Sequence, residues 1–256
     1  MRPANRVVDC WDMSTFTPGP DAGSSSPEHA RPYTVLSPTA KITHEVERRR
    51  SKFRAHLVRS ESEASAQAWV EELRRAYPDA RHHCSAWVLG PERRIQRAHD
   101  DGEPSGTAGA PILAALMKSE MPDGAADLSD VTAVVLRWFG GTLLGPGGLV
   151  SAYSDAVSGA LRGAQEQGQL RVRAPMRGFE VSAPISEAGR WEHELRAAGV
   201  LVTETVYTDD GAHARIRLSV PDSQTQVADL HRRIAALSAG AVAPEPSTAH
   251  WVDRPR

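Results

Sequence analysis

The most continuous apolar run in the chain is VTAVVLRW, residues 131–138. A short run of this kind is typical of a strand that is buried on both faces. Residues 43–46 and 53–58 alternate between polar and apolar side chains and also predict strands. The run CSAWVLG, 84–90, predicts a fourth strand, and 94–99 follow it as a hairpin partner. The centre of the chain should therefore contain a sheet.

Three segments of the same region have the 3.6-residue periodicity of helices with one buried face. In the first, Ser60 and Glu63 have capping-box spacing, and Pro78 ends the pattern. Its apolar positions are Ala66, Trp69, Val70, Leu73 and Tyr77. The second helix should begin near Pro111, which suits a first turn because it has no amide hydrogen to leave unsatisfied. The third should extend from Leu149 to about Ala164.

The pattern divides the chain into domains. Residues 1–40 are rich in Pro, Ser and Gly and predict a disordered leader. A first domain should cover 41–170, and a hinge is expected near Ala174 and Pro175. Residues 176–240 read as strand, helix, two strands and helix, the order of a ferredoxin-like fold. Residues 241–256 are expected to form a tail and give little support for a final strand.

Composition adds few constraints. The chain has 256 residues and a formal net charge of −2, so any nucleic-acid binding must come from a local patch. Its two cysteines, Cys10 and Cys84, are far apart, which makes a disulfide framework improbable. No secretory h-region and no run of 18 apolar residues occurs. These features predict a soluble cytoplasmic protein that does not engage membranes.

The loop DDGEPSGTAG, residues 100–109, concentrates acidic and small residues. Asp100, Asp101 and Glu103 could converge on one cation, with Ser105 and Thr107 as further oxygen ligands of the kind that magnesium accepts. In the commoner alternative, Asp100 and Asp101 accept backbone amides in a tight turn and the glycines supply its torsions. We favour the turn, so magnesium stays an alternative and no other cofactor is predicted.

A second loop, GGTLLGPGG, lies between the apolar strand at 131–138 and the third helix. A strand-to-helix junction aims free amides and the positive helix end at an anion. The sequence is not a P-loop, and Val150 stands where a dinucleotide-binding fingerprint needs its third glycine. Close backbone packing is the alternative role of these glycines. The positions concerned are Gly140, Gly141, Gly145, Gly147 and Gly148.

Arg137 connects the two loops in our interpretation. It ends an apolar strand, where an unpaired guanidinium would be costly, so a carboxylate partner is expected. We predict a pair with Asp100 or Asp101, and one binding surface made of both loops, with His82 beside them. In ARHHC, residues 80–84, His82 and Cys84 lie on the same face of the expected strand. They supply at most two ligands, and structural zinc needs four.

The basic run from Arg48 is the candidate for nucleic-acid contact. Its members are Arg48, Arg49, Arg50, Lys52 and Arg54. The alternative is a charged edge strand that discourages aggregation. Trp138 and Phe139 could stack on bases, although core packing is the commoner use of such residues.

Four motifs, taken together, resemble the YigZ/IMPACT family. They are SKF at 51–53, ARHHC at 80–84, DDGEPSGTAGAPIL at 100–113 and RWFGGTLLGPGGLVSAYSDAV at 137–157. The resemblance implies an α+β chain: an IMPACT-type domain like domain 2 of ribosomal protein S5, then a ferredoxin-like domain similar to the last domain of elongation factor G. The family usually has a basic residue in place of Ala110 and an arginine in place of Ser151. If those residues contact phosphate, this chain lacks two such contacts.

The resemblance implies a role but no settled reaction. Eukaryotic members regulate translation, and a nucleic-acid or ribosome-associated role is the usual proposal for the bacterial branch. We therefore expect a non-enzymatic translation-linked regulator that binds RNA, the ribosome or a protein of the translation apparatus. The alternative is a magnesium-dependent enzyme acting on a phosphorylated small molecule or nucleotide. A third possibility is a purely protein-binding role.

Overall fold

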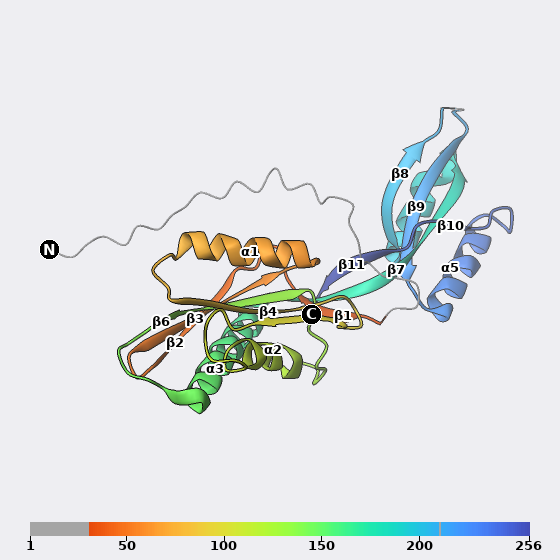
Figure 1. The fold of residues 1–256 in the computed structure, drawn as a ribbon. Helices are drawn as coiled ribbons and strands as arrows, with labels where there is room; N and C mark the ends of the chain where they lie inside the picture. The colour runs from red at the N-terminus through yellow and green to blue at the C-terminus, as the bar shows by residue number, and fades with distance from the viewer. Residues whose placement is uncertain (1–30, 210) are drawn as a thin grey trace.

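The computed structural model describes residues 31–209 and 211–256, which form an α+β fold with two antiparallel sheets (Figure 1). The first sheet has the strand order β2-β3-β6-β4-β5. Its strands are β2 (Ile42–Arg48), β3 (Ser51–Arg59), β4 (His82–Leu89), β5 (Ile95–His99) and β6 (Val131–Trp138). Every strand predicted in this region is present. Periodicity was sufficient because each strand is bounded by local turn signals.

The central strand β6 is buried on both faces, as its continuous apolar run predicts. Ala133 and Val135 pack into the cluster formed with α2 (Gly109–Lys118) and α3 (Gly145–Glu166). Val134 and Leu136 face the opposite way, into the cluster formed with α1 (Glu63–Ala76). Figure 1 shows α1 on one side of this sheet and α2 and α3 on the other.

No helix in the described ranges has the length and apolar character that crossing a membrane requires.

Helix α1 begins two residues later than predicted. The residue that caps it is Ser62, whose Oγ accepts the amide of Ser65 at 3.1 Å, while Ser65 Oγ accepts the amide of Ser62 at 3.2 Å. The predicted cap, Ser60, is buried and bonded to the sheet: its Oγ accepts the hydroxyl of Thr132 at 2.8 Å. The capping-box spacing occurs twice here, and tertiary contacts decide which serine caps the helix.

The second sheet contains a ferredoxin-like unit. Its elements are β7 (Leu170–Pro184), α4 (Ile185–Ala197), β8 (Leu201–Tyr207), β9 (His213–Pro221), α5 (Gln224–Leu237) and β10 (Glu245–Pro246). The strands lie in the order β10-β7-β9-β8, all antiparallel. Helices α4 and α5 pack on one face through Trp191, Leu195, Leu230 and Ile234. This confirms the predicted fold class for the C-terminal part.

Three predicted boundaries are wrong. Residues 33–36, placed in the leader at 1–40, form the buried strand β1 (Tyr33–Leu36), which pairs with β7; residues 1–30 lie outside the described ranges. The tail at 241–256 contains β10 and a further strand, β11 (His250–Pro255). No hinge exists at Ala174 and Pro175, because β7 continues through both and β11 pairs with it there. All three errors concern partners distant in sequence.

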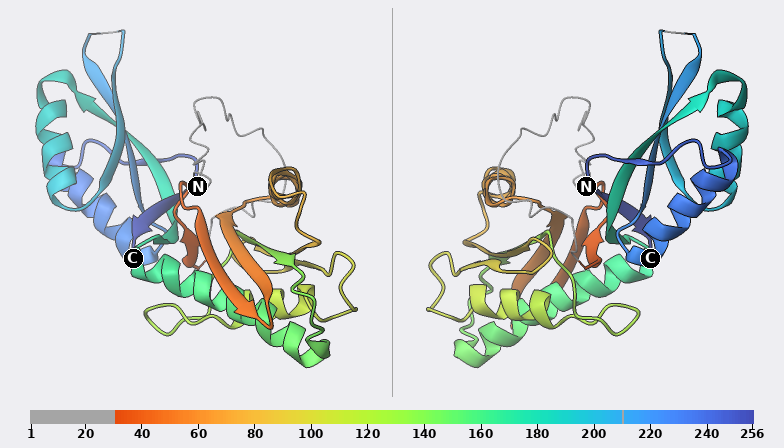
Figure 2. Two further views of the ribbon diagram at one scale, coloured as in Figure 1. Left: turned by 90° about the vertical axis from the view of Figure 1, so that its left-hand side faces the viewer. Right: turned by 90° about the vertical axis from the view of Figure 1, so that its right-hand side faces the viewer.

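Strand β11 also fastens the two parts of the chain together (Figures 1 and 2). Arg59 of β3 forms an ion pair with Asp253 of β11, and the Arg59 side chain is only 6% exposed. Glu61 bonds both Arg59 and Arg173 of β7, each at 2.8 Å. The long strand β7 and these ion pairs therefore join the part of the chain that contains the first sheet to the part that contains the second.

Candidate functional site

Both glycine-rich loops meet at one end of the first sheet. Together they line a pocket of about 320 Å³. Strand β6 brings Arg137 to this end, and the adjacent start of β4 brings Arg81 and His82, because His82 lies opposite Arg137 in the register. The remaining wall consists of Gly102, Glu103, Pro104, Phe139, Leu143, Leu144, Gly145, Pro146 and Leu149. The acidic loop and the strand-to-helix loop are thus neighbours in space.

Arg137 is paired, but with a different carboxylate from those predicted. Its Nη1 donates to Oε1 of Glu103 at 2.5 Å, and the hydroxyl of Tyr153 donates to the same oxygen at 2.7 Å. The side chains of Arg137 and Glu103 are 7% and 3% exposed. The predicted pair with Asp100 or Asp101 is wrong because the backbone turns at Asp101, with φ of 45°. That turn directs Glu103 inward.

Asp100 and Asp101 instead stabilise the loop itself. Asp100 accepts the amides of Gly106, Ala108 and Gly109 at 2.8 to 3.0 Å, and so caps the start of α2. Although partial burial opposes it, these amides hold the pKa of Asp100 below its ordinary value. Asp101 accepts the amide of His83 at 2.6 Å and pairs with Arg74 at 3.0 Å.

These contacts agree with the prediction that Asp100 and Asp101 accept backbone amides in a tight turn. The pKa of Asp101 is lowered against the opposing effect of burial by the same two donors, the His83 amide and Arg74. Thr107 Oγ1 donates to the carbonyl of Pro104 at 2.6 Å, and Ser105 is exposed. Within the described ranges, no cluster of three His, Cys, Asp or Glu side chains could hold a metal ion. Asp100, Asp101, Glu103 and Thr107, four of the five residues proposed as magnesium ligands, are thus engaged in other bonds.

The glycines of the second loop have different roles. A Cβ added at Gly140 would lie 2.0 Å from the carbonyl carbon of Arg50. The backbone at Gly140 therefore packs directly against the backbone at Arg50. Gly141 and Gly145 have φ of +84° and +73°, a region that L side chains rarely adopt. An added Cβ at Gly148 would come 3.0 Å from Leu144 Cβ, whereas Gly147 has open space around it.

Gly140→Ala should therefore destabilise the protein by about 1 to 3 kcal/mol, because the neighbouring backbone must move to admit the methyl group. Thermal unfolding measures the effect. Gly147→Ala is the matched control, and we expect its melting temperature to equal or slightly exceed that of the parent protein. A melting temperature for Gly140→Ala equal to that of the control would contradict the close-packing role.

The start of α3 is an uncapped helix end facing this pocket. Its N-cap is Leu144, which has no side-chain acceptor, and its first turn contains no acidic residue. Pro146 has no amide hydrogen, so Gly145 and Gly147 present the unsatisfied first-turn amides. The positive end of the α3 dipole therefore adds to the charge of Arg81 and Arg137.

The predicted basic run does not act as one stripe. Arg48 pairs with Asp155 at 3.0 Å, while Lys52 and Arg54 both pair with Glu45, at 3.9 and 2.8 Å. The other two members, Arg49 and Arg50, lie at the β2–β3 turn beside the second loop. Arg49 Nη1 donates to the carbonyl of Leu143 at 3.0 Å. Strand alternation and cross-strand pairing thus separate the run into a paired part and a turn near the pocket.

His82 has a defined tautomer. Its Nδ1 lies 2.8 Å from the carbonyl oxygen of Asp101, and since a carbonyl only accepts, Nδ1 carries the hydrogen. His82 lines the pocket, and its other ring nitrogen, Nε2, lies 3.8 Å from Glu103 Oε1. Cys84 is buried, donates to the carbonyl of Asp100 at 3.0 Å, and has a pKa raised chiefly by burial. Its thiol is structural.

Sequence reasoning did not single out Arg81, which precedes the two histidines of ARHHC. For Phe139 it weighed base stacking against core packing and favoured the core. Phe139 is 41% exposed, and its ring lies 5.9 Å from the guanidinium carbon of Arg81 and 5.7 Å from that of Arg137. The available signal was its position directly after β6, where a strand emerges from the core.

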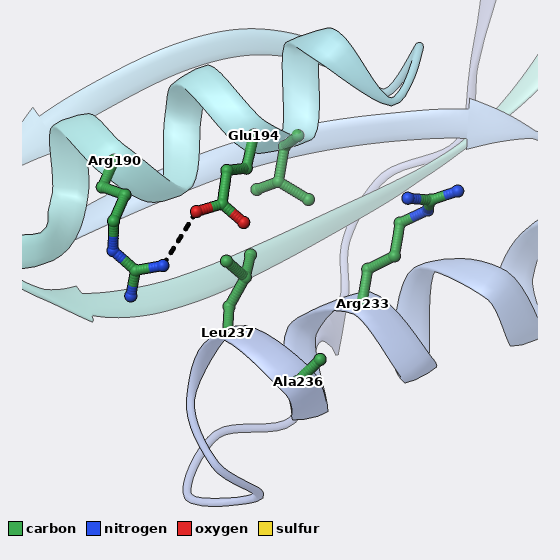
Figure 3. A pocket seen from close by; sticks show the side chains of 6 residues that line it. Arg190, Glu194, Arg233, Ala236 and Leu237 are labelled. Atoms are coloured by element: carbon green, nitrogen blue, oxygen red, sulfur yellow. Dashed lines mark hydrogen bonds and ion pairs between the residues drawn. The ribbon is translucent and has the colours of Figure 1, made fainter.

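A second hollow, of about 230 Å³, lies between α4 and α5 (Figure 3). Arg190 pairs with Glu194 at 2.8 Å across its wall, and Arg233 pairs with Asp229 at 2.6 Å. Its charges are satisfied by neighbours on the same helices. We assign it no ligand.

Comparison with known proteins is consistent with these motifs. The model of the Impact N-terminal domain matches residues 49–161. "IMPACT family member YigZ" of Escherichia coli (strain K12) is 35% identical over 213 residues, covering 81% of this chain and 95% of the relative. "IMPACT family member YvyE" of Bacillus subtilis (strain 168) is 39% identical over 169 residues, with coverages of 65% and 72%. A crystal structure described as that of a hypothetical protein aligns with a TM-score of 0.52, 33% identity, and coverages of 84% and 97%.

Proposed function

Because this chain belongs to the IMPACT family, we propose that it is a non-enzymatic cytoplasmic protein of the translation apparatus that binds single-stranded RNA. The observation that carries the proposal is the pocket between the two loops, where an uncapped helix end meets the guanidinium groups of Arg81 and Arg137. Helix amides and arginines are the protein groups that most often contact phosphate. The chain's small net charge makes such a local site necessary for binding.

The charge around the pocket supports a phosphate backbone as ligand. Arg49, Arg50 and Arg81 are exposed and form no ion pair among the described residues. They lie at the same sheet end, since Arg50 contacts Gly140 and Arg81 donates its amide to the carbonyl of Arg137 at 2.9 Å. Arginines outside ion pairs exchange counterions for phosphates without first breaking a salt bridge, which favours binding.

Two exposed apolar side chains favour a single strand over a duplex. Phe139 is 41% exposed and Leu143 is 79% exposed, and both line the pocket. An aromatic face beside arginines stacks on an unpaired base of any identity, whereas bases in a duplex are already stacked on each other. We therefore expect weak sequence preference.

The two departures from the family pattern lie away from the pocket wall. Ala110 is exposed in the first turn of α2. Ser151 is exposed on α3, and its hydroxyl donates to Asp155 at 3.1 Å, the residue that pairs with Arg48. Neither lines the pocket. Loss of basic residues at these positions would weaken outer contacts while leaving the central ones in place.

Replacing both Arg50 and Arg81 with alanine should lower affinity for oligouridylate about tenfold or more in low salt. The slope of log affinity against log salt should become shallower by about 0.7 for each phosphate contact removed. Fluorescence anisotropy titrations at several salt concentrations measure both quantities. Arg232→Ala, on the exposed surface of α5, is the matched control. Unchanged binding and slope in the double variant would rule out this surface.

An enzyme acting on a phosphorylated small molecule or nucleotide is the competing function. The tautomer of His82 favours it, because an Nε2 lone pair at a pocket wall can accept a proton from a substrate or water. This function predicts turnover of nucleotides in the presence of magnesium that disappears in His82→Gln. Binding of RNA without turnover by the parent protein would favour the binding role instead.

A further inference from the structure

We infer that the pocket between the two loops holds a terminal phosphate monoester of a nucleotide, so that RNA is bound by a phosphorylated end. This inference rests on the proposed function, because it takes RNA as the molecule that supplies the phosphate. It narrows that function to the recognition of an RNA end. The shared chemistry is a nucleotide phosphomonoester, which an RNA end or a free nucleoside monophosphate can supply. An internal phosphodiester, with chain on both sides, does not have this chemistry.

The buried inner wall of the pocket points to a chain end. The side chains of Arg137, Glu103 and His82 are 7%, 3% and 12% exposed, so these polar groups lie at the bottom of the pocket. A continuous backbone is usually bound in an open groove that tracks several phosphates. A pocket of about 320 Å³ is at the small end of ligand sites, which begin at roughly 300 Å³, and it suits a single nucleotide.

Arg137 provides evidence that is independent of the helix end. Its Nη1 bonds Glu103, but its buried Nε has no hydrogen-bond partner among the described residues. A buried guanidinium N–H without a partner is unfavourable. Glu103 compensates the charge of Arg137 and also accepts from Tyr153. What Arg137 still lacks is therefore an acceptor for its Nε–H.

The donors at the pocket suit a phosphomonoester. Such a group has three terminal oxygens that accept hydrogen bonds. The pocket wall includes Arg81, Arg137 and Gly145, and Gly147 presents a further amide in the same helical turn. The charge of Arg137 is compensated by Glu103, so Arg81 and the helix end supply the positive potential. The exposed ring of Phe139 borders these donors, within stacking reach of the base attached to the same phosphate.

Gly147→Asp is the sharpest test. An added side chain at Gly147 meets nothing within 4 Å, and a carboxylate in the first turn of a helix is favourable for folding. The fold should therefore persist, while the new charge repels a phosphate bound at this helix end. Gly147→Asn has the same shape without the charge and is the matched control.

The measurement compares oligouridylate carrying a 5′-phosphate, a 3′-phosphate or only hydroxyl ends. We expect the parent protein and Gly147→Asn to prefer one phosphorylated RNA by about tenfold or more, and Gly147→Asp to lose that preference. Binding of the hydroxyl-ended RNA should be the same in the parent protein and Gly147→Asn, and in Gly147→Asp it should fall by less than binding of the preferred phosphorylated RNA. Uridine monophosphate, but not uridine, should compete with the phosphorylated RNA.

The outcomes separate this inference from the proposed function. Equal binding of all three RNAs by the parent protein would overturn end recognition while leaving RNA binding intact. A phosphate preference that Gly147→Asp retains would overturn the placement of the phosphate at α3. If uridine monophosphate binds and none of the RNAs does, the phosphate pocket is supported and the RNA-binding function fails. Binding of neither nucleotide nor RNA would overturn both.

Discussion

Replacing Arg137 with methionine should lower the free energy of unfolding by about 3 to 5 kcal/mol, the usual cost of removing one partner of a buried ion pair. The reason lies with the residue left behind. Glu103 is 3% exposed and would keep only the hydroxyl of Tyr153 as a donor to Oε1. Urea unfolding followed by tryptophan fluorescence gives the free energy directly.

Two controls make this result specific. Arg97→Met breaks a pair with Glu63 at 3.0 Å in which both side chains are well exposed, at 52% and 40%, so its unfolding midpoint should stay unchanged. In the double variant Arg137→Met, Glu103→Leu, the uncompensated charge is gone, and most of the lost stability should return. If Arg137→Met unfolds at the same urea concentration as Arg97→Met, the pair does not stabilise the site as inferred.

The sequence predicted the elements of the first domain because their signals are local. Alternation in β2 and β3, the apolar run of β6 and the helical stripe of α3 each specify one element without reference to its partner. Short strands that depend on distant partners were missed. Strand β1 is four residues long beside a proline-rich segment, and β11 contains polar residues and Pro255, so neither shows a clear period.

The site was predictable in position but not in its contacts. Two loops that both follow strands of one sheet could be expected to meet, and they do. The partner of Arg137 could not be predicted, because it depends on left-handed torsions at Asp101 and Gly102. These torsions direct Glu103 toward Arg137 and leave Asp100 and Asp101 on backbone amides. Residue types do not specify such a rotation. The same limit applies to Arg81 and Phe139, whose importance comes only from their place at the sheet end.

The glycines of the second loop show how one motif supports both packing and binding. Gly140 admits the backbone of Arg50, which places the arginines of the β2–β3 turn beside the pocket. Gly147 meets no such packing requirement, and the absence of a side chain there keeps the first-turn amides of α3 accessible. The packing glycine thus positions cations, and the unpacked glycine exposes donors to the same ligand.

Lowering the pH from about 6.5 to about 4 should remove roughly 3 kcal/mol of stability through one residue, His56. Burial, and secondarily the charge of Arg54, lowers the pKa of His56 from 6.5 to about 4. Between these values the unfolded chain binds a proton that the folded protein excludes, so the free energy of unfolding falls as the pH falls, and this loss levels off below pH 4. The folded ring is 6% exposed against Tyr77, and its Nε2 has no hydrogen-bond partner in the described ranges.

Urea unfolding at a series of pH values between 7 and 4 measures this dependence. His56→Gln, which cannot take up the proton, should have a correspondingly flatter profile, since the titrations shared by the two proteins cancel in the comparison. His193→Gln, at an exposed position on α4, serves as the control and should follow the parent profile. Parallel profiles for the parent protein and His56→Gln would show that the folded protein accepts the proton on His56. The charged ring would then need a partner among the residues packed beside it.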